Sequence, residues 1–243
     1  MTEMTGYAVT AQFYDPMTEA SHAHVRAQIT DALNGLDARS HPIVDIGAGT
    51  GLTTRAIAAV LPETEIVAVE PDPFMRPALM TRIWSDPDLR RRVSILPMPV
   101  LDAPLPPVIA GAVASASLVH FSPADRARLW TLLEERLLPA GRIVVEIQCP
   151  LSREIPETLL ATERIGGVHY EGWASAVPVD EQRLHWHLTY VARCGDVEID
   201  RRSTDHVCWV ISSRDVLTEA RASGLDGAVT GDLVVLGKAA STT

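Results

Sequence analysis

The chain has 243 residues, of which 47% are hydrophobic, and a formal net charge of −10 at pH 7. This length can bury a full core, either as one enlarged domain or as a domain with a small appendage. The acidic balance disfavours nucleic acid as a partner because it repels phosphate backbones. No apolar run reaches the length of a membrane span, so no membrane association is expected.

The cysteines and the N-terminus indicate the compartment. Cys149, Cys194 and Cys208 are odd in number and widely spaced, which suits reduced thiols better than a disulfide framework or a cysteine-based metal site. Residues 1–5 contain neither a basic nor an apolar stretch, so no secretory signal is expected. These features predict a cytoplasmic protein.

In chain order, the first strong signal is an amphipathic helix, predicted by apolar residues at helical spacing from Val25 to Leu36. Residues 43–51 then read Ile-Val-Asp-Ile-Gly-Ala-Gly-Thr-Gly, an apolar strand that runs into a glycine loop. The alternating glycines let the backbone turn tightly and approach a ligand where a Cβ would collide. A helix is expected from Thr53 to Leu61, and its first N–H groups are unpaired.

A second apolar strand, residues 66–69, ends on Glu70, an acid that can accept both hydroxyls of a ribose. The loop and this acid together predict a nucleoside-binding crevice. A dinucleotide loop needs glycine where Leu52 stands, and a P-loop needs lysine there. Neither phosphate signature is met, which disfavours a nicotinamide oxidoreductase.

Helices and strands continue to alternate as far as residue 148. Helices are expected from Pro73 towards Trp84, and from Pro123 to a turn at 139–141. Strands are expected at residues 93–96, 108–115 and 142–148. This rhythm predicts a doubly wound, mostly parallel α/β sheet that binds ligands at the carboxyl ends of its strands.

Residues 151–212 follow a different pattern. Residues 184–191 alternate with a period of two and residues 196–211 offer a second long strand, which together predict an antiparallel hairpin. A helix at 213–222 and a strand at 233–236 then complete the chain.

Histidines on the first hairpin strand raise the question of a metal. His185 and His187 share a face, with Asp205 and His206 as candidate ligands opposite. No third ligand has a fixed sequence relation to them. A solvated polar face is the interpretation we adopt, and no metal is expected.

The pattern Asp45-x-Gly47-x-Gly49-x-Gly51, followed by Glu70, resembles motif I and the next acidic position of the class I S-adenosylmethionine-dependent methyltransferases. The resemblance covers residues 40 to about 150. It implies a seven-stranded Rossmann-like methyltransferase fold, here with a C-terminal antiparallel hairpin extension, and S-adenosyl-L-methionine as cofactor. It also implies that the loop passes the methionine moiety, that Asp45 contacts the methionine end directly or through water, and that Glu70 holds the ribose.

The resemblance divides the chain into three regions. Residues 1–40 are expected to form an N-terminal helical lid, and residues 41–150 the cofactor-binding core. Residues 151–243 are expected to contain an acceptor-side insertion at 152–179, the hairpin and the last core strand.

The adenine side departs from the family pattern, because no acid precedes Asp102 after the third strand. Adenine is therefore expected to rest on apolar side chains. The complete set of predicted cofactor contacts is Tyr14, Asp45, Gly47, Ala48, Gly49, Gly51, Glu70, Pro71, Met98, Val100 and Ser115.

On the acceptor side, His120 follows the fourth strand and is the expected general base if the acceptor arrives protonated. A structural histidine at the strand end is the alternative. The second choices for the base lie in the insertion and are His169, Tyr170 and Glu171. The predicted acceptor contacts are Tyr7, His169, Tyr170 and Trp173.

The aromatic N-terminal stretch allows two interpretations. Tyr7 and Tyr14 resemble the tyrosine-rich segment that closes over the cofactor in many small-molecule methyltransferases. Alternatively, these aromatics pin the N-terminal helix to the core.

The predicted function is methyl transfer to a small-molecule acceptor in specialised metabolism. The chain lacks the Asn-Pro-Pro-Tyr signature after its fourth strand, which argues against nucleobase and glutamine-amide acceptors. The alternative is a non-methylating relative that binds the cofactor and promotes a cyclisation or rearrangement. A homodimer is a further expectation.

Overall fold

The structure is a computed structural model that describes residues 6–148 and 151–240, without the side chains of residues 20 and 21. The chain forms two compact units. The antiparallel unit comprises Met1–His24 and Leu151–Val210, and the parallel unit comprises Val25–Pro150 and Ile211–Thr243. No helix among the described residues is long and apolar enough to cross a membrane.

The parallel unit is built on a seven-stranded sheet in the order β10-β11-β5-β4-β1-β2-β3. Its parallel strands are β1 (Ile43–Ile46), β2 (Ile66–Val69), β3 (Val93–Leu96), β4 (Ile109–Ala114) and β5 (Leu137–Glu146). β11 (Leu233–Lys238) runs antiparallel to β5, and β10 (Leu225–Thr230) antiparallel to β11. β1, β2 and β4 are buried along their whole length, as continuous apolar runs require in a sheet covered on both faces.

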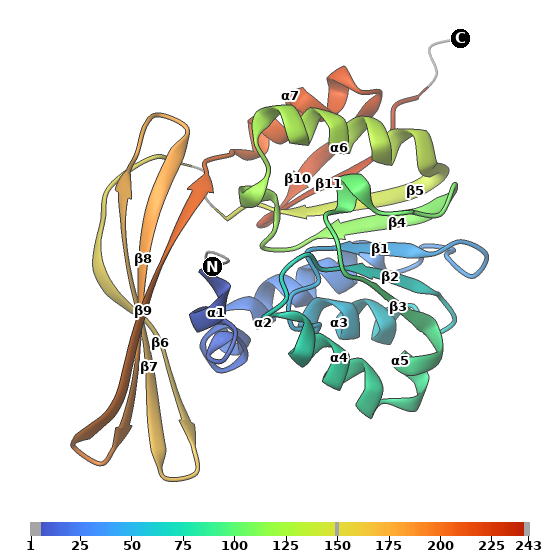
Figure 1. Ribbon diagram of the computed structural model, residues 1–243. Coiled ribbons are helices and arrows are strands. Elements are labelled where there is room, and N and C mark those ends of the chain that lie inside the picture. The colour runs from blue at the N-terminus through green and yellow to red at the C-terminus, as the bar shows by residue number, and fades with distance from the viewer. Residues whose placement is uncertain (1–5, 149–150, 241–243) are drawn as a thin grey trace. The chain divides into compact units, whose positions relative to one another are not determined.

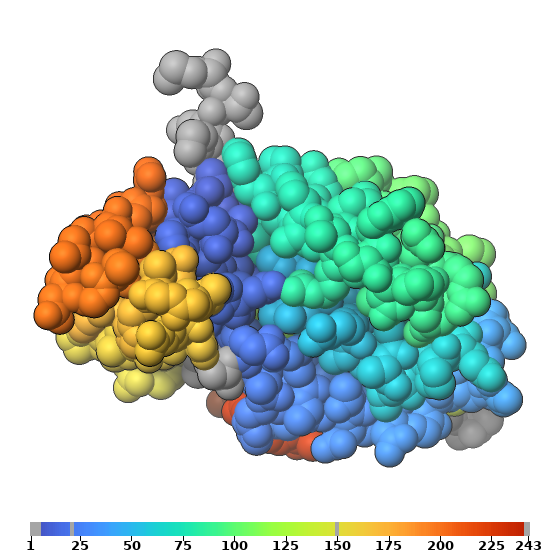
Figure 2. Space-filling view, turned by 90° about the horizontal axis from the view of Figure 1, so that it is seen from below, coloured from blue at the N-terminus to red at the C-terminus, as the bar shows by residue number. Residues whose placement is uncertain are grey.

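Helices cover both faces of this sheet (Figure 1). One face carries the end of α2 (Tyr14–Leu33), α3 (Leu52–Val60), α4 (Arg76–Ser85) and α5 (Pro87–Arg92), and the other carries α6 (Pro123–Arg136) and α7 (Ser213–Ala222). Each face has its own core, with Ile29, Ile57 and Leu79 in the first and Leu129 and Trp130 in the second. Figure 2 views the first face from below, where α3 to α5 form the surface in blue to teal. The doubly wound, mostly parallel sheet is therefore confirmed.

Two local predictions in this unit were wrong. The helix expected from Pro73 begins at Arg76. The turn expected at residues 139–141 lies inside β5, which starts directly after α6 because Leu137 is already extended, with φ −67° and ψ 134°. The register against β4 shifts at that point, so the proline-glycine stretch forms an irregularity in the strand.

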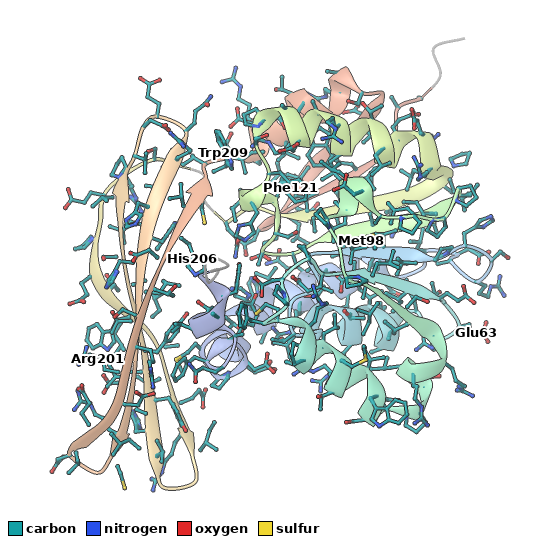
Figure 3. All side chains as sticks on the ribbon, in the orientation of Figure 1. Glu63, Met98, Phe121, Arg201, His206 and Trp209 are labelled. Carbon is teal, nitrogen blue, oxygen red and sulfur yellow. The ribbon has the colours of Figure 1, made fainter. Side chains whose placement is uncertain are left out.

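The antiparallel unit is a four-stranded sheet in the order β6-β7-β8-β9. Its strands are β6 (Ile155–Ile165), β7 (Val168–Pro178), β8 (Arg183–Cys194) and β9 (Val197–Trp209). The predicted hairpin is β8 and β9, and Figure 3 labels Arg201, His206 and Trp209 along the second of these strands. Segment 152–179, which we expected to be a separate insertion, contributes β6 and β7 to the same sheet.

The N-terminal aromatics pack on one face of that sheet. The Phe13 ring stacks on Tyr190 with 4.7 Å between centroids, and the Tyr7 ring meets His206 edge-on at 4.9 Å. Met17 fills the space above Gly172, where its Sδ would lie only 2.9 Å from an added Cβ. These contacts attach the N-terminal aromatics to the antiparallel sheet, whereas the alternative interpretation attached them to the core. The lid role of this segment stays a prediction.

The two units differ from the predicted regions 1–40, 41–150 and 151–243. Residues 25–38 supply Val25, Ile29 and Leu33 to a core of the parallel unit. At the other end, α7, β10 and β11 complete the parallel unit and its sheet. Core packing and strand pairing therefore assign both segments to the parallel unit, and the division falls inside α2.

Candidate active site

The glycine loop joins β1 to α3 at the carboxyl edge of the parallel sheet. Gly47, Gly49 and Gly51 have φ values of +70°, +59° and +88°, a region that side-chain-bearing residues rarely adopt. A Cβ on Gly47 would lie 2.6 Å from the Cβ of Ser117, and one on Gly51 would lie 2.7 Å from the Cδ1 of Leu79. A Cβ on Gly49 would meet nothing closer than 3.5 Å. A side chain would thus clash with the protein at the outer two glycines, whereas at the middle one a Cβ would make only van der Waals contact.

Backbone hydrogen bonds tie this loop to β2. The N–H groups of Gly47 and Ala48 both donate to the carbonyl oxygen of Val69, at 2.9 and 3.1 Å. The N–H of Gly51 donates to the carbonyl of Ala48 at 2.8 Å, which closes the turn before α3 begins. The loop conformation is consequently fixed by its own backbone and by the end of the neighbouring strand.

Glu70 stands at the end of β2 and is only 5% exposed. One carboxylate oxygen accepts the N–H of Gly49 and the other accepts the N–H of Asp72, both at 2.7 Å. Burial raises the pKa of Glu70, although these two hydrogen bonds oppose the shift. A carboxylate has about four acceptor sites, so each oxygen can also accept a hydroxyl. Pro71, a predicted contact, follows directly and is exposed.

Asp45 lies on β1 and is 1% exposed. The hydroxyl of Thr54, from the first turn of α3, donates to its Oδ2 at 2.5 Å. Burial raises the pKa of Asp45 to about 7, and the nearby Glu70 adds to the rise while the Thr54 hydrogen bond opposes it. We did not predict Thr54 from the sequence, although a threonine one turn into the helix after a glycine loop is a readable signal.

The raised pKa of Asp45 predicts a pH dependence of cofactor binding. If Asp45 meets the methionine end, the ligand's ammonium favours the carboxylate, lowers its pKa and so releases a proton. Affinity for S-adenosylhomocysteine should therefore fall about tenfold per pH unit below the pKa of about 7 and level off above it. Calorimetry in buffers of different ionisation enthalpy measures the released proton directly. Asp45→Asn should abolish the release, and a variant that still released the proton would assign it to another group.

The predicted adenine contacts lie beyond β3, near the 3₁₀ turn η1 (Val100–Asp102). Val100 is 3% exposed and belongs to a buried core, whereas Met98 is half-buried. Figure 3 shows Phe121, from the loop after β4, and Glu63, from the loop before β2, at opposite edges of the sheet. Contact of Met98 and Val100 with adenine stays a prediction.

The turn after β4 is hydrogen-bonded to an acid that we did not predict. Glu146, the last residue of β5, accepts the hydroxyl of Ser115 at 2.7 Å and the N–H of Ala116 at 2.9 Å, both at Oε2. Ala116 has φ +55° and is the one non-glycine residue with positive φ in the described chain. The sequence placed Glu146 inside the strand predicted at residues 142–148, so it did not mark this acid as a site residue.

His120 ends the 3₁₀ turn η2 (Leu118–His120), which follows directly. Its N–H donates to the carbonyl of Ser117 at 3.1 Å, and its side chain is exposed. An exposed imidazole at the carboxyl edge of β4 is compatible with a general base. The role of base and the role of a structural histidine both stay predictions.

The predicted acceptor contacts belong to the antiparallel unit, and the structure does not bring them together. Tyr170 faces Phe13, with 6.4 Å between ring centroids, on the side that the N-terminal segment covers. His169 and Trp173 point to the opposite side because side chains alternate along β7, and the Trp173 Nε1 donates to Glu171. Tyr7 packs on His206. The acceptor role of these residues, and the cofactor role of half-buried Tyr14, stay predictions.

The histidines of β8 share a single carboxylate. His187 Nδ1 lies 2.9 Å and His185 Nε2 3.4 Å from Oδ1 of Asp205. Across residues 6–148 and 151–240, no cluster of three or more potential ligands could hold a metal ion.

The region that contains the glycine loop and Glu70 resembles known proteins. Residues 44–145 match a family model described as a methyltransferase domain. Streptomyces venezuelae DesVI is 16% identical with a TM-score of 0.73, covering 98% of this chain and 100% of that one. KedS8, a sugar N-methyltransferase from Streptoalloteichus sp ATCC 53650, is 15% identical with a TM-score of 0.68, covering 88% and 87%.

A third structure is the glycopeptide N-methyltransferase MtfA bound to S-adenosylmethionine. It is 20% identical with a TM-score of 0.52, covering 81% of this chain and 80% of that one. No curated protein sequence matches the chain. Identities this low show the fold alone, and on that basis the predicted Rossmann-like fold is confirmed.

Proposed function

We propose that this chain, whose residues 44–145 match a family model described as a methyltransferase domain, transfers a methyl group from S-adenosyl-L-methionine to a small-molecule acceptor. The observation that carries the proposal is the pairing of Glu70 with the glycine loop. A buried carboxylate ends β2 and accepts the N–H of Gly49, the one loop glycine at which a Cβ would make only van der Waals contact with the protein.

The residues present fit this cofactor. Glu70 would accept the ribose hydroxyls, Asp45 would meet the methionine ammonium, and Gly49, which has no Cβ, would let a ligand approach the backbone. When bound, S-adenosylmethionine supplies an activated methyl group on a sulfonium. The MtfA complex with the same molecule, in a similar fold, supports the assignment.

We infer that the acceptor atom is an amine nitrogen of a small natural product. Two proteins of similar fold, KedS8 and MtfA, are described as N-methyltransferases of a sugar and of a glycopeptide. An amine is protonated near pH 7 and must lose a proton to attack, which gives His120 its role as base. Alignment of nitrogen, methyl and sulfur in one line lowers the activation barrier further, by about 7–11 kcal/mol in well-oriented systems.

The setting that we propose is specialised metabolite biosynthesis in the cytoplasm. Cys194 is a free thiol, which suits a reducing compartment. The net charge of −10 favours a small acceptor over nucleic acid. A homodimer remains part of the proposal.

Transfer of a labelled methyl group tests the proposal. The chain is incubated with methyl-labelled S-adenosylmethionine and a panel of amino sugars and other small amines, and acceptors are separated by mass spectrometry. The expected result is label in an acceptor together with an equal amount of S-adenosylhomocysteine. Cofactor binding with an isomerised acceptor that carries no label would instead support the non-methylating alternative.

A further inference from the structure

We propose that Glu146 is a positioning residue that holds the turn after β4 against the glycine loop and thereby sets the affinity for the cofactor. The proposal rests on the proposed function, because the glycine loop is taken as the cofactor site. All the residues involved lie in the parallel unit.

The turn adopts a backbone that its sequence does not favour. Ala116 has φ +55°, a conformation that alanine rarely adopts and that a glycine would accept without strain. Residues in such conformations persist only where their surroundings hold them. The partners that hold Ala116 are the hydrogen bonds from its own N–H and from the Ser115 hydroxyl to Glu146 Oε2.

Glu146 is suited to this positioning role, and we assign it no other role. It is 7% exposed, and none of the described lysines and arginines forms an ion pair with it. Its backbone is fixed by pairing with Leu233 of β11, so the carboxylate projects from a rigid strand. Removal of the carboxylate would leave the Ala116 N–H unpaired and the strained turn unsupported.

The turn reaches the glycine loop through Ser117. Its Cβ lies where a Cβ on Gly47 would come within 2.6 Å, so Ser117 packs directly on the loop. Its hydroxyl is buried and has no hydrogen-bond partner among the described residues. Ser117 therefore has no side-chain bond of its own to keep it in place, and its position follows from Ala116 and Glu146.

Calorimetric titration with S-adenosylhomocysteine tests the proposal on the full chain. Glu146→Ala should weaken binding roughly 5- to 30-fold, the factor that a left-handed backbone preference contributes. Glu146→Gln should keep most of the affinity, because its amide oxygen can still accept both donors. Adding Ala116→Gly to Glu146→Ala should restore most of the loss, since glycine adopts the turn without support.

The matched control is Glu219→Gln. Glu219 lies on α7, forms no hydrogen bond with residues 115–117, and accepts hydrogen bonds from Arg126 and Trp130. This variant should lower the melting temperature without changing the affinity, which separates general destabilisation from loss of positioning. Should Glu146→Ala fail to fold, Ser115→Ala with and without Ala116→Gly makes the same comparison with one donor removed.

The outcomes distinguish failure of the positioning role from failure of the proposed function. Equal affinity of Glu146→Ala and the unmodified chain, or no recovery on adding Ala116→Gly, would overturn the positioning role alone. An unmodified chain that did not bind S-adenosylhomocysteine would overturn the proposed function and the positioning role with it.

Discussion

Replacing His120 with alanine should lower the turnover of a protonated amine acceptor by roughly 10²–10⁴-fold, the usual contribution of a general base. The reason is positional: the imidazole is exposed at the carboxyl edge of β4, one turn beyond Ser117. Binding of the cofactor should not change, because Glu70 and Asp45 lie on other strands. Initial rates at saturating cofactor and acceptor measure the effect.

The pH dependence separates a base from a structural histidine. Above the pKa of the acceptor amine the proton is already lost, so the deficit of His120→Ala should shrink there. His41→Ala, which changes a histidine just before β1 at the amino edge of the sheet, is the control and should retain full turnover. A His120→Ala enzyme with weakened cofactor binding and normal turnover at saturation would contradict this division of roles.

Replacing Glu70 with alanine should weaken binding of S-adenosylhomocysteine by roughly 10²–10⁴-fold. Two hydrogen bonds from ribose hydroxyls to a buried carboxylate are lost, each worth about 1.5–3 kcal/mol. The same carboxylate also accepts the N–H of Gly49, so the loop loses a support as well. Titration calorimetry measures the effect at pH 8, above the pKa of Asp45 of about 7, so that Asp45 is mostly ionised in both proteins.

Glutamine at position 70 should be nearly as damaging, because its amide nitrogen would face either the Gly49 or the Asp72 N–H. Glu65→Ala is the matched control. It removes an exposed glutamate just before the same strand, at the amino edge of the sheet, and should bind the ligand normally. Full affinity in a folded Glu70→Ala variant would remove Glu70 from the site.

The elements that the sequence predicted well are those whose signals are local. β1, β2 and β3 are short, mostly apolar runs. The loop between β1 and α3 needs glycines because its backbone has positive φ values, whatever the rest of the fold. The place of Glu70 was predicted from an equally local signal, because an acid directly after a buried strand must lie at the carboxyl end of that strand.

What the sequence did not disclose depends on pairing between distant segments. β6 is mostly exposed and lacks a clean alternation, so its pairing with β7 could not be read from its composition. The role of Glu146 depends on the register of β5 against β4, which brings residues about 30 positions apart into contact. The N-terminal aromatics Phe13 and Tyr7 likewise have their partners, Tyr190 and His206, about 180 and about 200 positions later.

A crystal structure of the chain with bound S-adenosylhomocysteine tests the central claim most directly. We expect both ribose hydroxyls within hydrogen-bond distance of the Glu70 carboxylate. We also expect the ligand in contact with the backbone of Gly49, and its sulfur directed towards the carboxyl end of β4. A ligand bound away from the ends of β1 and β2, or with its ribose remote from Glu70, would contradict it.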